Sequence, residues 1–403
     1  MCSCDSSPRE LAQVKDSKKI LVTSGEWQAA LACVQSLGRR GHRVFVIDHE
    51  PYVALAHSRF CAGLIHSPRE SQTEEYMVFL LDLIKSGEYD LLIPISDACV
   101  GMCVNRREEL KKYIRLVVPE KETYAKVADK RLTCLFAIDR GIPIPRTYFP
   151  PDREALFSMA QNSIYPCVVK MPFSSASKGV FFINSKQELI RLYESQNFQG
   201  QWPIIQERII GEFFGITGVA HQGRVLASLI HTTNQEFSLG GTPPISYSVN
   251  NTELMERAGY TISQLKWTGA FNLDYINMPD RGFRLLEINP RFAGSLNFSY
   301  RMGLDLPFVY YHLAFDGSPD DIQTGQYADG IMFRTIFPSE IMWLCQHRDY
   351  LGRFLKNFLN LRAKSNIYWD DLPLIWWQAK ETRWHCQDMK ISADNKKKGL
   401  LCD

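Results

Sequence analysis

The sequence of 403 residues has no apolar run long enough to cross a membrane, and residues 1–19 contain no apolar segment of the kind found in secretory signals. It also lacks a dominant sign of charge, because 46 Lys and Arg stand against 44 Asp and Glu, a formal net charge of +2. Binding to nucleic acid or to an anionic membrane through bulk charge is therefore excluded. We expect a cytoplasmic protein with neither a nucleic acid nor a membrane as its partner.

Paired cysteine spacing is missing as well. The 11 cysteines are an odd number, and their scatter along the chain matches neither a disulfide framework nor a zinc site. We expect reduced thiols. Cys99 and Cys103 lie one helical turn apart, but no second Cys or His pair is close in sequence, so small core residues are the favoured interpretation over metal ligands.

The sequence does contain apolar material for several cores, with 45% hydrophobic residues in a chain too long for a single one. After a polar tail (1–18), residues 19–118 alternate apolar strands with helices (27–40 and 73–85), which predicts a doubly wound parallel sheet. The loop 23–26 lacks the G-x-G-x-x-G glycines of a dinucleotide site, which disfavours an NAD-dependent oxidoreductase.

A second pattern begins near residue 119. A helix over 121–140 precedes a proline-containing exit, and the later strands have few helices between them, which predicts an α+β domain with antiparallel sheet over 119–317, in lobes of about 119–205 and 206–317. An extension, 318–403, contains an amphipathic segment and a tryptophan-rich stretch whose role the sequence does not show. The predicted strands of the second domain are 165–170, 180–184, 204–207, 214–221, 224–231, 269–276 and 283–288.

The segments 271–276 and 284–289 form the most informative pattern, an acidic hairpin. A turn centred between Asp280 and Arg281 would place Asp274 opposite Glu287, with Asn272 opposite Asn289. Two carboxylates about 5 Å apart repel each other, and a divalent cation removes that cost. Oxygen ligands of this kind favour Mg²⁺ over zinc. The alternative is an exposed hairpin whose acids face solvent.

Three further features suit a nucleotide phosphate. Lys170 ends an apolar strand, and a buried lysine is costly without an anion. The small-residue loop 174–179 follows it and can wrap an anion, although surface turns often share this composition. The segment 204–212 joins two sheet regions and could present a purine with backbone hydrogen bonds and a ribose with Glu212; an ordinary edge strand is the alternative.

These motifs occur in a fixed order along the chain, and together they resemble the ATP-grasp superfamily. The resemblance is to its carboxylate–amine ligase-like members, which are related to carbamoyl-phosphate synthetase and D-alanine–D-alanine ligase, and it covers about residues 19–317. The motifs are Ala128-Asp129-Lys130, Gly141-Ile-Pro-Ile-Pro145, Val168-Val-Lys170, Gln206-Glu207 with Gly211-Glu212, Asp274, and Leu286-Glu-Ile-Asn-Pro-Arg291. The last of these motifs is the most specific.

The resemblance implies roles for particular residues. Lys130 and Lys170 would hold the phosphates of ATP, Lys170 taking part in catalysis, and Arg291 would steady an acyl phosphate. Ser96-Asp97 would be a substrate contact in the amino-terminal domain. The implied magnesium ligands are Asp274, Glu287 and Asn289. The further nucleotide contacts would be Ser174, Ser175, Ser177, Lys178 and Gly179 in a mobile loop, and Gln206, Glu207, Ile209 and Glu212 around adenine and ribose.

The expected fold is α/β plus α+β: a doubly wound domain, a two-lobed ATP-grasp domain and a small carboxy-terminal extension. The implied activity is ATP- and Mg²⁺-dependent ligation of a small-molecule carboxylate to an amine through an acyl phosphate. Asn272 stands where dipeptide ligases place an arginine, which disfavours D-alanine ligation. A bicarbonate-activating enzyme and a nucleotide-binding module without turnover are the alternatives. The oligomeric state stays open, with a homodimer as one candidate.

Two histidines, His221 and His231, flank the strand 224–230 near the expected cleft and invite a role as general base. An amine can lose its proton to phosphate or water instead, so a structural role is the favoured interpretation.

Overall fold

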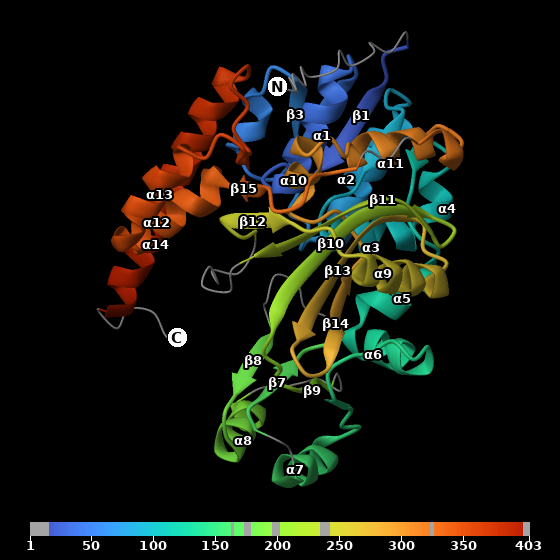
Figure 1. The fold of residues 1–403 in the computed structure, drawn as a ribbon. Helices are drawn as coiled ribbons and strands as arrows, with labels where there is room; N and C mark the ends of the chain where they lie inside the picture. Colours follow the sequence, from blue (N-terminus) through green and yellow to red (C-terminus); the bar gives the residue numbers. More distant parts are fainter. Residues whose placement is uncertain are drawn as a thin grey trace.

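Three β-sheets organise the computed structural model (Figure 1), which describes residues 16–162, 165–172, 179–195, 202–233, 242–322 and 326–397. Within these residues no helix is both long enough and apolar enough to cross a bilayer.

The amino-terminal sheet is parallel, with the strand order β3-β2-β1-β4-β5. Alternate strand residues point to opposite faces, so Ile20 and Val22 pack under α1 (Gln28–Arg39), while Leu21 packs under α2 (Thr73–Lys85) and α3 (Asp97–Asn105). This arrangement confirms the predicted doubly wound domain. The strands are β1 (Lys19–Thr23), β2 (Arg43–Asp48), β3 (Cys61–His66), β4 (Leu91–Ile93) and β5 (Arg115–Leu116).

Cys99 and Cys103 are core residues, as predicted, and belong to the cluster that contains Leu21, on the sheet face covered by α2 and α3. Both thiols are free and buried, and burial raises the pKa of Cys99 to about 12. Among the described residues no three His, Cys, Asp or Glu side chains converge as metal ligands.

The second sheet is antiparallel and has the order β6-β9-β7-β8. Two helices, α7 (Arg153–Asn162) and α8 (Lys186–Ser195), cover it around a small core that contains Val169 and Ile205. Strands β7, β8 and β9 match the predicted ones to within two residues, whereas β6 was not predicted. The strands of this sheet are β6 (Thr147–Tyr148), β7 (Cys167–Lys170), β8 (Val180–Ile183) and β9 (Ile204–Glu207).

The third sheet has seven strands in the order β14-β13-β10-β11-β12-β15-β16. Helix α9 (Thr252–Leu265) packs on one face, and helices α10 (Leu296–Arg301) and α11 (Leu306–Ala314) follow β14 in the chain. Two short strands from beyond residue 317 extend the sheet, a connection that the sequence did not predict. The strands are β10 (Glu212–His221), β11 (Arg224–Thr233), β12 (Ile245–Ser248), β13 (Gly269–Met278), β14 (Gly282–Asn289), β15 (Met332–Arg334) and β16 (Lys364–Ser365).

The single helix predicted over 121–140 is wrong. Asp129 has extended backbone angles and separates α5 (Lys121–Ala128) from α6 (Lys130–Asp139). Its carboxylate caps α6 by accepting from the backbone N–H groups of Arg131 at 2.7 Å and Leu132 at 3.3 Å. The break places Lys130 in the first turn of α6.

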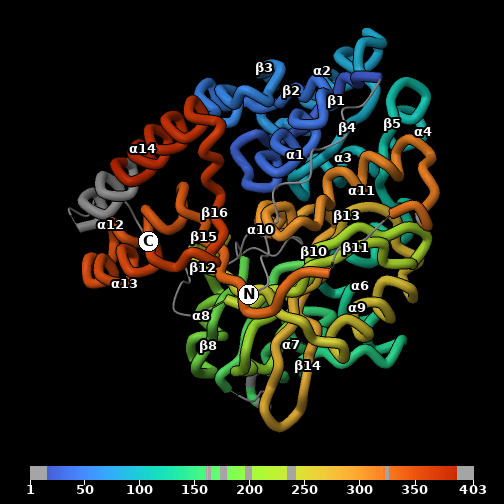
Figure 2. The backbone as a smooth tube through the Cα atoms, turned by 45° about the horizontal axis from the view of Figure 1, so that its top comes forward, coloured from blue at the N-terminus to red at the C-terminus, as the bar shows by residue number. Residues whose placement is uncertain are grey.

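The carboxy-terminal extension lies along one side of the molecule, beside both the amino-terminal domain and the seven-stranded sheet (Figure 2). The Trp377 ring stacks on the His57 ring with the centroids 3.8 Å apart and so packs on the body of the protein, whereas Trp376 is 60% exposed. The predicted amphipathic segment is broken into short helices. The helices of the extension are η3 (Pro319–Asp321), η4 (Ile336–Glu340), α12 (Ile341–Gln346), η5 (Arg348–Tyr350), α13 (Leu351–Phe358) and α14 (Leu372–Lys397).

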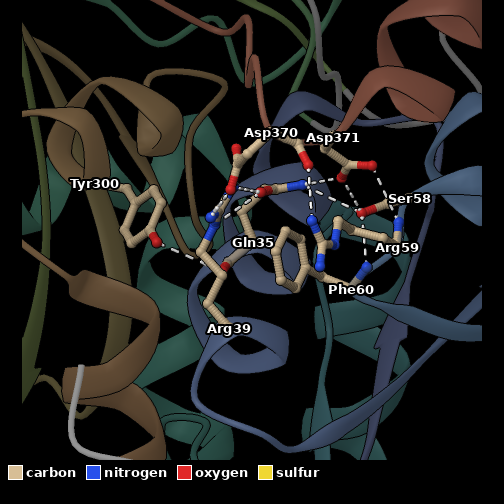
Figure 3. A network of polar contacts seen from close by, with 8 residues as sticks. All are labelled: Gln35, Arg39, Ser58, Arg59, Phe60, Tyr300, Asp370 and Asp371. Atoms are coloured by element: carbon tan, nitrogen blue, oxygen red, sulfur yellow. Dashed lines mark hydrogen bonds and ion pairs between the residues drawn. The ribbon is translucent and has the colours of Figure 1, made fainter. Parts of the chain in front are cut away.

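A buried polar network ties this extension to the amino-terminal domain (Figure 3). Asp371, which is fully buried, accepts hydrogen bonds from the Ser58 hydroxyl, from Gln35 Nε2 at 2.7 Å and from the backbone N–H of Arg59 at 3.0 Å. Its neighbour Asp370 forms an ion pair with Arg39 at the surface. The network therefore fixes the chain just before α14 against α1.

Candidate active site

The acidic hairpin has the register predicted at its functional end. Asp274 lies opposite Glu287, and Asn272 lies opposite Asn289. The turn itself differs, because Met278 pairs with Gly282 and thereby shifts the register by one residue. A bulge on β14 restores it: Tyr275 pairs with Leu285, which leaves Leu286 as the extra residue. The opposition of the two acids thus depends on a bulge that the sequence did not predict.

Asp274 is held by two amides. Asn272 Nδ2 donates to its Oδ1 at 2.8 Å, and Asn289 Nδ2 donates to its Oδ2 at 3.2 Å. Burial and, second to it, the charge of Glu287 raise the pKa of Asp274 to about 7 despite these hydrogen bonds. The carboxyl group therefore has too little positive charge around it. Oxygen-only donors with this deficit fit a hard divalent cation such as Mg²⁺.

Two lysines approach the acids from different elements. Lys130 Nζ in α6 lies 2.5 Å from Glu287 Oε1. Lys170 Nζ at the end of β7 donates at 3.5 Å to the carbonyl of Leu286, the bulge residue. Burial lowers the pKa of Lys170, Lys130 adds to this, and Glu287 opposes it. The structure therefore brings together both predicted lysines and the predicted acids.

Arg291 connects this site to the amino-terminal domain. Its Nε lies 2.9 Å from Asp97 Oδ2, and its guanidinium lies over the Trp27 ring at 5.0 Å. Asp97 starts α3 directly after β4, so the carboxyl edge of the parallel sheet faces Arg291. The predicted substrate contact at Asp97 is thus adjacent to the predicted catalytic arginine.

The predicted adenine and ribose residues lie on β9 and at the start of β10. Glu207 accepts from Arg281 Nη1 at 2.9 Å and from the backbone N–H of Arg146 at 3.0 Å. Burial works against ionisation of Glu207, but these donors lower its pKa overall. Gln206 is buried and donates to Thr147 at 2.9 Å. Of the two remaining residues, Ile209 lies between β9 and β10, and Glu212 is the exposed first residue of β10. Their nucleotide roles stay predictions.

The predicted mobile loop is mostly outside the described residues, which include only Gly179 of it. Gly179 has a positive φ of 77° and its carbonyl accepts from the backbone N–H of Met171 at 2.9 Å. The other loop residues, Ser174, Ser175, Ser177 and Lys178, lie outside the described part of the chain.

Two polar side chains on the sheet face of the acids have buried oxygens. These are Oγ1 of Thr217, which the sequence did not single out, and Oδ1 of Asn272, and neither has a hydrogen-bond partner among the described residues. Thr217 lies opposite Asn272 across β10 and β13, so both share the face that carries Asp274. The sequence also did not predict the contact of Arg281 with Glu207, because only the folded hairpin brings the two residues together. Buried polar groups without partners indicate a ligand at this face.

The histidine expectation agrees with the environment of His231. Burial lowers the pKa of His231 to about 4, so the ring is neutral near pH 7. A Cβ on Gly215, the residue opposite it, would lie 2.5 Å from its Nε2, so the glycine makes room for the ring.

Comparison with known proteins decides the nature of this region: residues 127–295 match the family model described as the ATP-grasp domain. The chain contains an ATP-grasp domain. It is 22% identical over 290 residues to the carbamoyl phosphate synthase large chain of Clavibacter sepedonicus, which covers 67% of this chain and 26% of that relative. The chain thus spans about a quarter of that relative's length.

Solved structures share the fold. An N5-carboxyaminoimidazole ribonucleotide synthetase in its ADP complex superposes with a TM-score of 0.64 at 12% identity, covering 85% of this chain and 87% of that one. An L-amino acid ligase from Bacillus licheniformis superposes with a TM-score of 0.59 at 15% identity, covering 77% of this chain and 78% of that one.

The four-stranded and the seven-stranded sheets meet at the site. Lys170 comes from the four-stranded sheet, whereas Asp274, Glu287 and Asn289 come from the seven-stranded sheet. The hydrogen bond from Lys170 to Leu286 crosses between the two sheets. Any change in their separation would therefore move a positive charge relative to the acids.

Proposed function

We propose that this chain is an ATP-dependent ligase that activates a small-molecule carboxylate as an acyl phosphate and joins it to an amine. The opposition of Asp274 and Glu287, with Lys130 and Lys170 beside them, carries the proposal. The ATP-grasp domain and the ligases that share its fold support it. D-alanine ligation remains disfavoured by Asn272.

The residues fit ATP and Mg²⁺. Asp274, Glu287 and Asn289 would hold Mg²⁺, which supplies positive charge at phosphate oxygens, and Lys130 and Lys170 would hold the phosphates. In this structure Lys130 instead neutralises Glu287 at 2.5 Å. The lysine thus limits the repulsion between the acids and lies where a phosphate can accept its charge.

The chain's own residues would align the reactants rather than react covalently. The substrate carboxylate oxygen forms a bond to the γ-phosphorus as the bond to ADP breaks; the amine nitrogen then attacks the carbonyl carbon, and inorganic phosphate leaves with the amine proton lost to phosphate or water. Lys170 stabilises charge on the transferring group, and Arg291 stabilises the acyl phosphate. Because Asp97 already orients Arg291 at 2.9 Å, the guanidinium needs little reorganisation.

A screen of pooled carboxylates and amines for ADP release with Mg²⁺ tests the proposal, with bicarbonate alone as a separate arm. ADP release that requires both an acid and an amine is the expected result. Asp274→Ala and Glu287→Ala should each abolish it, with circular dichroism of the wild type. Glu253→Ala on the exposed surface of α9 is the matched control and should keep wild-type turnover. Wild-type turnover by either hairpin variant contradicts the assignment.

A further inference from the structure

A cavity of about 1190 Å³ lies between the amino-terminal domain and the far end of the ATP-grasp sheet. One wall is β5 with the chain before it, and the other is the β10–β11 turn with the end of α9. On β10, His221 in its wall lies six residues beyond Gly215, the residue opposite Asp274, which is roughly 20 Å along a strand. This interdomain cavity is therefore separate from the acidic hairpin.

Cations without counterions line the interdomain cavity. Arg107 is neutralised by Glu120 at 2.6 Å, but among the described residues no carboxylate lies within ion-pair distance of Lys111, Lys112 or Lys266. The guanidinium of Arg115 lies over the Phe315 ring at 4.7 Å and likewise forms no ion pair with a described residue. Besides Glu120, the acids in the wall are Asp90 and Asp316.

The positive groups come from both walls. Lys111, Lys112 and Arg115 belong to the amino-terminal domain, and Lys266 ends α9 of the ATP-grasp domain with a left-handed backbone. Burial and, second to it, the neighbouring Arg107 lower the pKa of Lys111, while Glu108 and Glu120 oppose this without forming an ion pair with it. Nδ1 of His221 is buried in the same wall without a hydrogen-bond partner among the described residues.

We propose that the interdomain cavity binds a small polyanion that carries two or more phosphate groups, with Lys111, Lys112, Arg115 and Lys266 as its charge partners. Lysine is a compact point charge that suits phosphate, and cations lining a concave surface concentrate the positive potential. A ligand with several charged groups can contact cations on both walls, whereas one phosphate contacts a single wall. The volume accommodates a ligand of nucleotide size.

Calorimetric titration of Mg²⁺-free tripolyphosphate into three proteins tests this site: wild type, Lys111→Ala/Lys266→Ala, and Lys130→Met/Lys170→Met. The wild type should bind tripolyphosphate, and the Lys130/Lys170 variant should keep a binding site. The Lys111/Lys266 variant should lose that site, with at least tenfold weaker binding for the loss of two charge partners (about 1.4 kcal/mol per factor of ten). Lys356→Ala/Lys364→Ala, two lysines outside the cavity, is the matched control and should bind as the wild type does.

Binding by Lys111→Ala/Lys266→Ala equal to the wild type in affinity and stoichiometry would overturn the proposal. Complete loss of binding in Lys130→Met/Lys170→Met would also overturn it, because tripolyphosphate would then occupy the nucleotide site alone. Citrate that binds as tightly as tripolyphosphate would refute the preference for phosphate. None of these readouts depends on turnover, so the proposal can fail or succeed independently of the ligase activity.

Discussion

Replacing Asp274 by Asn should stabilise the ligand-free protein at alkaline pH while abolishing its activity. The pKa of this carboxyl group is about 7 in the folded chain and 3.8 when unperturbed. Because the folded state binds the proton more tightly, the carboxyl group costs no stability below pH 3.8, and the cost grows as the pH rises to 7. Above pH 7 the full difference of about three pKa units is expressed, which is about 4 kcal/mol.

The asparagine side chain of the Asp274→Asn variant carries no charge at any pH, so the variant does not lose stability as the pH rises. Its stability relative to the wild type should therefore rise by about 3 kcal/mol between pH 5 and pH 8. Urea unfolding followed by tryptophan fluorescence, with EDTA and without nucleotide, measures the difference at each pH. If the variant loses the hydrogen bonds to Asn272 or Asn289, the stability difference from the wild type changes by the same amount at pH 5 and at pH 8, and its pH dependence stays intact. A difference that stays constant from pH 5 to pH 8 would refute the reasoning.

Two further predictions concern stability outside the active site. Glu340→Gln should lower the free energy of unfolding, measured in urea, by about 3–5 kcal/mol. In the wild type the buried guanidinium of Arg334 lies 2.9 Å from the Glu340 carboxylate, and the substitution leaves it without a countercharge. Unchanged stability would refute this prediction. Asp371→Ala should cost about 3 kcal/mol or more, since three donors lose their acceptor. The adjacent Asp370→Ala breaks an ion pair whose Asp side chain is 52% exposed and should cost about 1 kcal/mol or less, so equal losses would contradict the distinction.

The sequence was sufficient for the parts of the fold that local pattern determines. Apolar alternation predicted the strands of the acidic hairpin, and the turn residues predicted the opposition of Asp274 and Glu287. The prediction was right at the acids although the turn was one residue shorter, because the bulge at Leu286 compensated for it. A bulge depends on tertiary contacts, such as the one from Lys170 to its carbonyl, and leaves no local pattern.

Other features could not be predicted because distant residues create them. Strand β16 has two residues, Lys364 and Ser365, and forms only where β15 offers it an edge. The contacts of Arg281 with Glu207 and of Arg291 with Asp97 join residues 74 and 194 positions apart. The break at Asp129 did have a local signal, since aspartate is a good N-cap, but the continuous helical pattern around it was misleading.

The position of Arg291 gives the amino-terminal domain a part in the site. In open α/β sheets, ligands bind beyond the carboxyl ends of the strands. Here Ser24 after β1 and Ser96 after β4 both donate to Glu70 at 2.6 Å, and Asp97 orients Arg291 toward that edge. In the proposed mechanism the acidic hairpin would hold the metal and the phosphates, while the parallel sheet would present hydroxyls and carboxylates to a substrate that enters beside Arg291. Variation at Ser24, Glu70 and Ser96 should accordingly alter the choice of substrate without changing the nucleotide site.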